Sequence, residues 1–283
     1  MRRLYEDVTD EEKQVIIDRY VNQNMGMRKA GSVFGYSDKI VKKILIEYDI
    51  PVKGQGGSSR QRYFLNEKYF NPNNQSHNSA YILGMLASDG NVSKEKNCIY
   101  IELQREDKEI LEKINNEIQN DREVKDYETG RGYKNSKLYF FSQKVKDDLS
   151  LYNIVPNKTY TNKDFLQNIK KEYYIDFIRG FFDGDGSIYW DNGTIKWQLS
   201  STSKQTLDHI QQILLDYGIN SSFQIQSNNN DVITWRLYFY GLENNKKLYN
   251  LFYSNINTLF MQRKFNKYND LFKNYSIQET TTA

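Results

Sequence analysis

The chain has 283 residues, of which 38% are hydrophobic and 27% charged, and its formal net charge is +3. Its length allows two domains, or one large domain with an appendage. The sequence contains no run of 18 apolar residues, no apolar signal core near its start and a single cysteine, Cys98. We therefore exclude membrane spans, disulfides within the chain and cysteine-rich zinc sites, and we expect a soluble intracellular protein.

Helix signals dominate residues 1–52. Thr9 is followed by acidic residues at positions 10–12, which predicts a helix start, because such a cap and acids in the first turn complement a helix amino-terminus. A second helix is predicted from Met27 to Phe34, and Ser37 is expected to cap a third. Three short helices with a tight turn before the last resemble a helix-turn-helix DNA-binding domain.

Basic residues are concentrated in this part of the chain, since residues 1–62 carry 12 Lys/Arg against 9 Asp/Glu. The third helix would present Lys39, Lys42 and Lys43 to a DNA major groove. Residues 53–62, KGQGGSSRQR, are predicted to be a flexible linker. Its basic residues would follow a phosphate backbone or enter a minor groove: Lys53, Arg60 and Arg62. A helical protein-binding module with a solvated lysine face is the alternative interpretation.

Residues 63–161 form the first of two similar segments. A mostly apolar helix is predicted up to residue 90, then strands at 91–93 and 98–104 and an amphipathic helix at 106–119. Strands at 122–127 and 136–142 and a short helix at 145–152 follow. Apolar and polar residues alternate along 98–104, which is typical of a sheet with one buried and one exposed face.

Residues 162–275 repeat this order. A mostly apolar helix at 177–186 precedes a hairpin turn at 191–193 and a strand from residue 194. Thr202 or Ser203 is expected to cap the next helix, and strands are predicted at 221–226 and 231–240, around a turn at 228–230. We expect an α+β fold of two pseudo-symmetric αββαββα repeats beside a small all-α domain. The tail at 276–283 is expected to be disordered.

One stretch occurs twice, 96 residues apart. Residues 81–90 read YILGMLASDG and residues 177–186 read FIRGFFDGDG, so that Gly84 matches Gly180 and Asp89 matches Asp185. A glycine inside a helix costs about 1 kcal/mol relative to alanine, so matched glycines indicate a packing role. We expect the two helices to pack on each other along these glycines. That contact would bring Asp89 and Asp185 together at the carboxyl ends of their helices.

A pair of carboxylates at this position is unfavourable by itself. The helix dipole is negative at the carboxyl end, and two nearby carboxylates repel each other. A bound divalent cation relieves both effects, and Mg²⁺ characteristically uses one or two carboxylates together with substrate phosphates. For a single copy, the alternative is that the Asp-Gly pair merely ends a helix and starts a hairpin.

The two stretches resemble the paired motifs of the LAGLIDADG homing endonucleases, in their single-chain form with two repeats. Residues 177–188, FIRGFFDGDGSI, match closely, whereas residues 81–92 match more loosely, with Ala87 where many members carry an aspartate. The resemblance implies a monomer whose two sheets form a saddle on double-stranded DNA. It also implies site-specific hydrolysis of both strands with Mg²⁺ or Mn²⁺, as in intron homing.

The resemblance further implies roles for individual residues. The catalytic residues would be Asp89, Asp185, Lys158 and Lys264. Gly90 and Gly186 would join the two aspartates as metal ligands, while Asp183 would only end its helix. Arg263 is the alternative to Lys264, and Asp107 and Ser203 are weaker candidates for orienting water. The polar sheet faces would read base edges through Gln104, Lys196, Gln198, Arg236 and Tyr238.

Two other functions are compatible with the sequence. One is a non-cleaving DNA-binding regulator that keeps the fold, and the other is a maturase that binds intron RNA. Both motif aspartates are present, which favours the nuclease over the regulator, because pure binding does not require carboxylates that face phosphates.

Overall fold

The computed structural model of the protein describes residues 5–23, 25–48, 50, 63–191, 194–227, 233–254 and 258–281. The chain divides into two compact units, Met1–Tyr63 and Phe64–Ala283, and each has a hydrophobic core of its own. The predicted linker at 53–62, with Lys53, Arg60 and Arg62, lies outside the described residues, as do the turn residues 192–193 and 228–230.

The first unit contains α1 (Asp10–Val21), α2 (Met27–Gly31) and α3 (Asp38–Glu47), with 3-10 turns at Tyr5–Asp7 and Ser32–Phe34. The Thr9 side chain accepts a hydrogen bond from the backbone of Glu12, whose side chain accepts one in return, so a capping box starts α1. Gly35 adopts a left-handed φ of 75° in the turn before α3, a conformation that glycine tolerates without strain. Apolar residues of α1 and α3 close the core: Ile16, Tyr20, Val41, Ile44 and Leu45.

The first half of the second unit runs α4 (His77–Ser88), β1 (Gly90–Val92), β2 (Cys98–Gln104), α5 (Lys108–Glu117), β3 (Lys125–Glu128), β4 (Lys134–Phe141) and α6 (Gln143–Ser150). Its strands form an antiparallel sheet in the order β1-β2-β4-β3. Strand β2 has the predicted bounds, whereas β3 begins later than predicted.

The second half repeats this order with α7 (Tyr174–Asp185), β5 (Gly186–Asp191), β6 (Thr194–Ser201), α8 (Lys204–Asp216), β7 (Ser222–Ser227), β8 (Ile233–Phe239) and α9 (Leu242–Tyr253). Its antiparallel sheet has the order β5-β6-β8-β7, which matches the first sheet strand for strand. Helix α10 (Gln262–Thr281) follows. The predicted α+β fold of two αββαββα repeats is confirmed.

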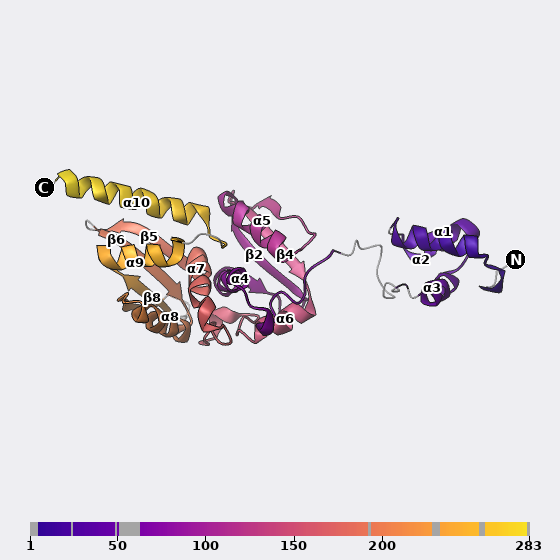
Figure 1. Ribbon diagram of the computed structural model, residues 1–283, viewed down its shortest axis with the longest axis horizontal. Helices are drawn as coiled ribbons and strands as arrows, with labels where there is room; N and C mark the ends of the chain where they lie inside the picture. The colour runs from indigo at the N-terminus through magenta and orange to yellow at the C-terminus, as the bar shows by residue number, and fades with distance from the viewer. Residues whose placement is uncertain are drawn as a thin grey trace. The chain divides into compact units, whose positions relative to one another are not determined.

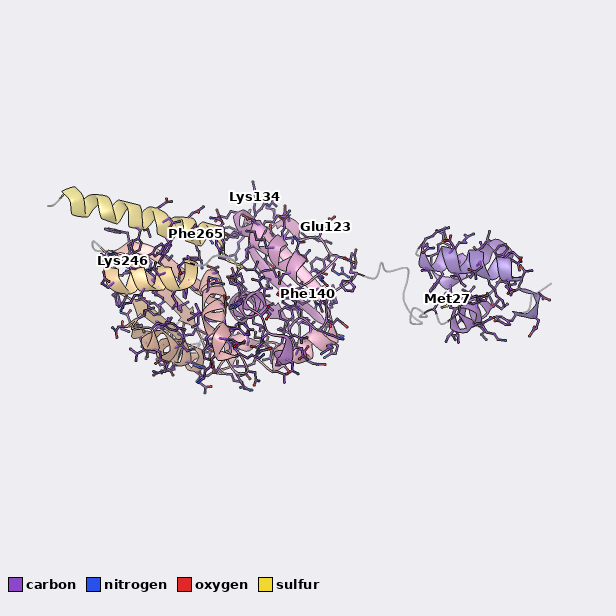
Figure 2. All side chains as sticks on the ribbon, viewed as in Figure 1. Met27, Glu123, Lys134, Phe140, Lys246 and Phe265 are labelled. Atoms are coloured by element: carbon purple, nitrogen blue, oxygen red, sulfur yellow. The ribbon has the colours of Figure 1, made fainter. Side chains whose placement is uncertain are left out.

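Helices α4 and α7 lie side by side in the middle of this unit, with one sheet on either side of the pair (Figure 1). Each sheet buries one face. In β2, Ile99, Ile101 and Leu103 are buried and the residues between them are partly exposed. Helix α5 covers this face, and Phe140 of β4, labelled in Figure 2, is 1% exposed in the core. The opposite, polar face of each sheet stays accessible.

Two parts of the second unit differ from what local sequence signals indicate. The tail predicted to be disordered is helical from Ser276 to Thr281, because α10 continues and no glycine or proline after Met261 interrupts it. Ile233 shares its place in the alternation of β8 with the buried Leu237 and Phe239, but it is 49% exposed at the start of that strand. Among the described residues, no helix is long and apolar enough to cross a membrane.

Candidate active site

Helices α4 and α7 touch through their backbones. A Cβ atom added to Gly84 would lie 2.1 Å from the carbonyl oxygen of Phe177, and one added to Gly180 would lie 2.0 Å from that of Tyr81. A larger residue fits at neither position unless a helix moves. The close strip continues at Gly184, where a Cβ would lie 1.9 Å from a serine hydroxyl of α4. The structure therefore places both predicted glycines at the helix contact.

The same contact brings Asp89 and Asp185 within electrostatic reach of each other. Asp89 directly follows α4, and Asp185 is the last residue of α7. Asp89 is half-buried and Asp185 reaches solvent, but packed protein surrounds both carboxylates. Loss of surrounding water raises the pKa of Asp89, against the effect of two nearby lysines. Loss of water, together with the charge of Asp89, raises the pKa of Asp185 to about 6.

Two lysines cap the helix ends that carry these aspartates. Lys264 is 7% exposed, and its ammonium donates to the carbonyl oxygens of Phe182 at 2.6 Å, Gly184 at 3.2 Å and Gly186 at 2.6 Å. Burial lowers the pKa of Lys264 to about 8. A lysine that caps the last carbonyls of a helix also opposes its negative dipole end.

Lys158 repeats this arrangement in the first half. Its ammonium donates to the carbonyl oxygen of Ser88 at 3.0 Å and to that of Gly90. The capped carbonyls are therefore at matching positions in the two repeats. The carbonyl oxygens of Gly90 and Gly186, predicted as metal ligands, are hydrogen-bonded to lysine, and both predicted catalytic lysines are engaged by backbone.

Asp183 lies near the end of α7, but it also forms a buried hydrogen-bonded contact between α7, α4 and the segment before α10. It is 1% exposed, and one of its carboxylate oxygens accepts hydrogen bonds from the Tyr81 hydroxyl at 2.7 Å and the Met261 amide at 2.8 Å. Its other oxygen has no hydrogen-bond partner among the described residues. Burial raises the pKa of Asp183 to about 6. At the matching positions, Phe177 and Ala87 replace Tyr81 and Asp183, so the polar pair has an apolar counterpart.

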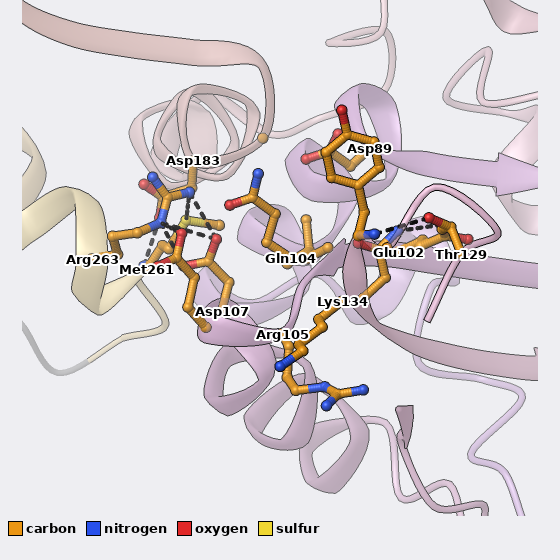
Figure 3. Close-up of a pocket in the computed structure, with 16 residues that line it drawn as sticks. Asp89, Glu102, Gln104, Arg105, Asp107, Thr129, Lys134, Asp183, Met261 and Arg263 are labelled. Carbon is orange, nitrogen blue, oxygen red and sulfur yellow. Dashed lines mark hydrogen bonds and ion pairs between the residues drawn. The ribbon is translucent and has the colours of Figure 1, made fainter. Parts of the chain in front are cut away.

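A cavity of about 920 Å³ opens beside Asp89. Arg263 and Asp107 meet in its wall (Figure 3). Arg263 Nε lies 2.9 Å from Asp107 Oδ1, and Nη2 lies 2.7 Å from Oδ2, so the guanidinium binds the carboxylate with two donors. This pair joins the amino-terminal end of α5 to the start of α10, that is, the two repeats.

A second, smaller cavity of about 270 Å³ lies beside Asp185. Lys158 is the positively charged residue in its described lining. Residues with hydroxyl groups form much of the rest: Ser88, Thr159, Ser200, Ser201, Thr202 and Thr234. Ser203, a candidate for orienting water, is buried, and its hydroxyl donates to the Lys163 carbonyl at 2.6 Å. That hydroxyl is therefore occupied.

The residues of the second unit that are predicted to read DNA lie on the polar sheet faces, and all but one of them are at least partly exposed. Gln104 is exposed at the end of β2, and Arg236 is half-buried on β8. On β6, Gln198 donates to Ser200 at 2.9 Å and Lys196 pairs with the Asp191 carboxylate.

Tyr238 is the exception. It is 8% exposed, and its ring stacks on Tyr240 with centroids 5.7 Å apart. The expected exposure of Tyr238 was wrong, whereas its role in reading bases stays a prediction.

The predicted DNA-reading lysines of the first unit lie on α3. Lys39 and Lys43 are exposed and Lys42 is half-buried. The Lys43 ammonium lies 3.9 Å from the ring centre of Tyr5, a cation–π contact that holds it close to the protein surface.

Two features of the site were missed in the sequence. The Tyr81–Asp183 hydrogen bond was not predicted. The sequence did hold a signal for it, because the matching positions in the other repeat, Phe177 and Ala87, are both apolar. The lining of the larger cavity by Lys134 and Asn135 of β4 had no local signal, because strand pairing places these residues beside Gln104.

The residues of the site can be compared with those that a divalent cation requires. Within the described part of the chain, no cluster of three or more His, Cys, Asp or Glu residues would hold a metal ion unaided. Asp89 and Asp185 together provide the hard oxygen donors that Mg²⁺ prefers, and loss of surrounding water raises the pKa of both carboxylates. The donor set therefore fits a cation that completes its shell with water and phosphate.

Family models match both halves of the second unit. Residues 172–253 match a LAGLIDADG-like domain, and residues 78–145 match the WhiA LAGLIDADG-like domain. The chain thus carries LAGLIDADG-like domains in both repeats.

Individual relatives are distant. An uncharacterized protein of Methanocaldococcus jannaschii is 26% identical over 201 residues, which cover 67% of this chain and 71% of the relative. The DNA-directed RNA polymerase subunit Rpo1C of the same organism is 27% identical over 143 residues, 50% of this chain but 16% of the relative.

Solved structures of similar fold include a homing endonuclease. Mesophilic variants of the homing endonuclease I-DmoI align with a TM-score of 0.47 at 13% identity, over 67% of this chain and 96% of theirs. Full-length DUF199/WhiA from Thermatoga maritima aligns with a TM-score of 0.44 at 16% identity, over 75% of this chain and 67% of that one.

Proposed function

We propose that the LAGLIDADG-like domains of this chain act together as a site-specific endonuclease that hydrolyses both strands of a DNA duplex. The observation that carries this proposal is the meeting of Asp89 and Asp185 at the ends of two helices packed backbone to backbone. Carboxylates kept at such an unfavourable place need a positively charged ligand, and a scissile phosphate with its cation provides one.

Divalent cations such as Mg²⁺ or Mn²⁺ would be held by Asp89 and Asp185. When bound, a cation of this kind activates water and stabilises the leaving oxygen of a phosphodiester. The chain itself places the carboxylates, because the Gly84–Gly180 contact holds the two helices close, with no room for a side chain between them. Lys158 and Lys264 act here chiefly as positioning residues, which cap the helix ends and lower the pKa of both aspartates.

The polar sheet faces would bind the duplex on either side of this site. Gln104, Gln198 and Arg236 carry the donors and acceptors that pair with base edges. In the first unit, Lys39 and Lys43 of α3 would add contacts in a major groove or to phosphates.

The test is cleavage of a randomised duplex library with and without Mg²⁺, followed by the same assay on Asp185→Asn and Asp89→Asn. We expect the wild type to cut a selected site only with a divalent cation. Each variant should lose cutting by at least about 100-fold while its duplex affinity changes little, since the lost group serves the chemical step. Normal cutting by Asp185→Asn in Mg²⁺ would falsify the assignment of this site.

A non-cleaving DNA-binding protein is the second candidate. It is favoured by the lysine caps, because the carbonyl oxygens of Gly90 and Gly186 already accept hydrogen bonds from ammonium groups. The library experiment separates the two candidates: a binding protein would enrich a duplex sequence and leave it intact at every cation concentration.

A further inference from the structure

The two cavities occupy matching places in the repeats but differ in their linings. Asp107 directly precedes α5 and Ser203 directly precedes α8, so these two residues stand at matching places in the repeats. The larger cavity has a charged lining: Asp89, Glu102, Arg105, Glu106, Asp107, Lys134, Asp183 and Arg263. The charged residues in the described lining of the smaller cavity are Lys158 and Asp185. A DNA phosphate beside Asp89 would therefore meet more acidic than basic groups.

Arg263 is placed to offset this repulsion. Its Nε and Nη2 are fixed by Asp107, whose side chain is 3% exposed, while the arginine side chain is 42% exposed. Nη1 makes no hydrogen bond with the described residues. A guanidinium held on one edge and open on the other is pre-ordered to bind a second anion with little further loss of side-chain entropy.

The second site has no counterpart of this pair. Ser203 stands where the first repeat has Asp107, and its hydroxyl is taken by the Lys163 carbonyl. The residue before Lys158 is Asn157, in a left-handed conformation with φ of 57°, whereas the residue before Lys264 is Arg263. Among the residues that the structure describes, no guanidinium lines the smaller cavity.

We propose that Arg263, held in place by Asp107, binds a backbone phosphate of the DNA strand next to Asp89, and that the site next to Asp185 lacks such a ligand. This inference rests on the proposed function insofar as the ligand is duplex DNA. The two DNA strands would therefore be bound unequally. The Arg263 guanidinium would bind the strand beside Asp89, whereas the other strand would meet only Lys158, whose ammonium already caps helix carbonyls.

The experiment measures how duplex affinity depends on salt, which counts phosphate contacts whether or not the DNA is cut. A fluorescent 30-base-pair duplex is titrated with the full chain from about 50 to 200 mM salt. We expect Arg263→Gln to reduce the slope of log affinity against log salt by about 1. Lys246→Gln is the matched control, because it removes one positive charge from the exposed face of α9 and should leave the slope unchanged.

A second variant removes the risk that a buried, unpaired Asp107 unfolds the protein. The double variant Asp107→Asn with Arg263→Gln removes the unpaired charge at position 107 and should show the same reduced slope. Arg263→Lys keeps the positive charge but loses the two-donor geometry of the guanidinium, so its salt slope should lie between those of the wild type and Arg263→Gln. An unchanged slope in folded Arg263→Gln and in the double variant overturns the inference and leaves the proposed function intact.

A second experiment measures cleavage of each DNA strand separately and tests the predicted difference between the strands. With each strand of a cut target labelled, Arg263→Gln should slow cutting of one strand by 10-fold or more and leave the other nearly unchanged; equal slowing of both strands overturns the claimed asymmetry. A wild type that binds duplex with the expected slopes but never cuts would refute the nuclease proposal and support Arg263 as a phosphate ligand. A wild type that does not bind duplex refutes both.

Discussion

Lys264 is a buried cation whose hydrogen bonds all go to backbone, and this makes it a stability residue as much as a site residue. We expect Lys264→Met to lower the free energy of unfolding by about 1–3 kcal/mol, because buried carbonyl oxygens lose their donor while the side-chain volume is kept. Urea denaturation without divalent cations measures this directly.

The matched control for this prediction is Lys246→Met on the exposed face of α9, which should change stability little. Lys158→Met should lie between the two, since Lys158 caps fewer carbonyls than Lys264. A Lys264→Met protein as stable as the wild type would show that the cap contributes nothing to folding.

The buried bond between Tyr81 and Asp183 makes a second prediction at this scale. Tyr81→Phe should destabilise the protein by about 1–3 kcal/mol, because Asp183 already has one oxygen without a partner and loses a donor to the other. Adding Asp183→Ala recreates the Phe–Ala pair found at the matching positions. The double variant should therefore be more stable than the sum of the single changes predicts, by about 0.5–3 kcal/mol of coupling. Strictly additive effects in a double-mutant cycle would argue against the pair.

At the scale of elements, the α4–α7 contact decides the geometry of the site. Alanine favours a helix over glycine by about 1 kcal/mol, but a methyl group on Gly180 would meet the Tyr81 carbonyl at 2.0 Å. Overpacking of this kind costs about 1–3 kcal/mol or more, so we expect Gly180→Ala to be destabilising overall.

Thermal unfolding of Gly180→Ala beside Gly130→Ala tests this expectation. Gly130 has open space around its Cβ position, so the control should be neutral. The Gly180 variant should also cut DNA poorly, because the helices would separate and move Asp89 away from Asp185. Equal melting temperatures for the two variants would contradict a tight contact.

The elements themselves were largely predictable. Alternation fixed the bounds of β2, and the Thr9 cap marked the start of α1, because both signals are local. The repeat of glycine and aspartate predicted which helices meet. Alternation failed where tertiary position decides burial: Tyr238 is buried, and Ile233 is exposed at the start of its strand.

The site was predictable only in outline. The paired motifs predicted Asp89 and Asp185. No local pattern in the sequence indicates that Lys264 donates to carbonyls at the end of α7 or that Arg263 pairs with Asp107. Those contacts join residues about 80 and 156 positions apart, and only the folded arrangement of the repeats brings them together.

At the scale of the molecule, the two compact units make separate contributions. The first unit has its own core and exposed lysines on α3, so removal of residues 1–62 should leave the second unit folded. We expect that shortened protein to keep a cooperative unfolding transition but to protect a shorter stretch of duplex in a nuclease footprint. An unchanged footprint would assign the first unit a role other than DNA contact.

The order in which the ribosome makes these parts has a consequence of its own. Asp89 and Asp107 emerge early, Asp185 follows, and Arg263 and Lys264 come last. A nascent polypeptide released before residue 263 would lack both the partner of Asp107 and the cap of α7. Truncated translation products would therefore lack these contacts at the start of α5 and at the end of α7.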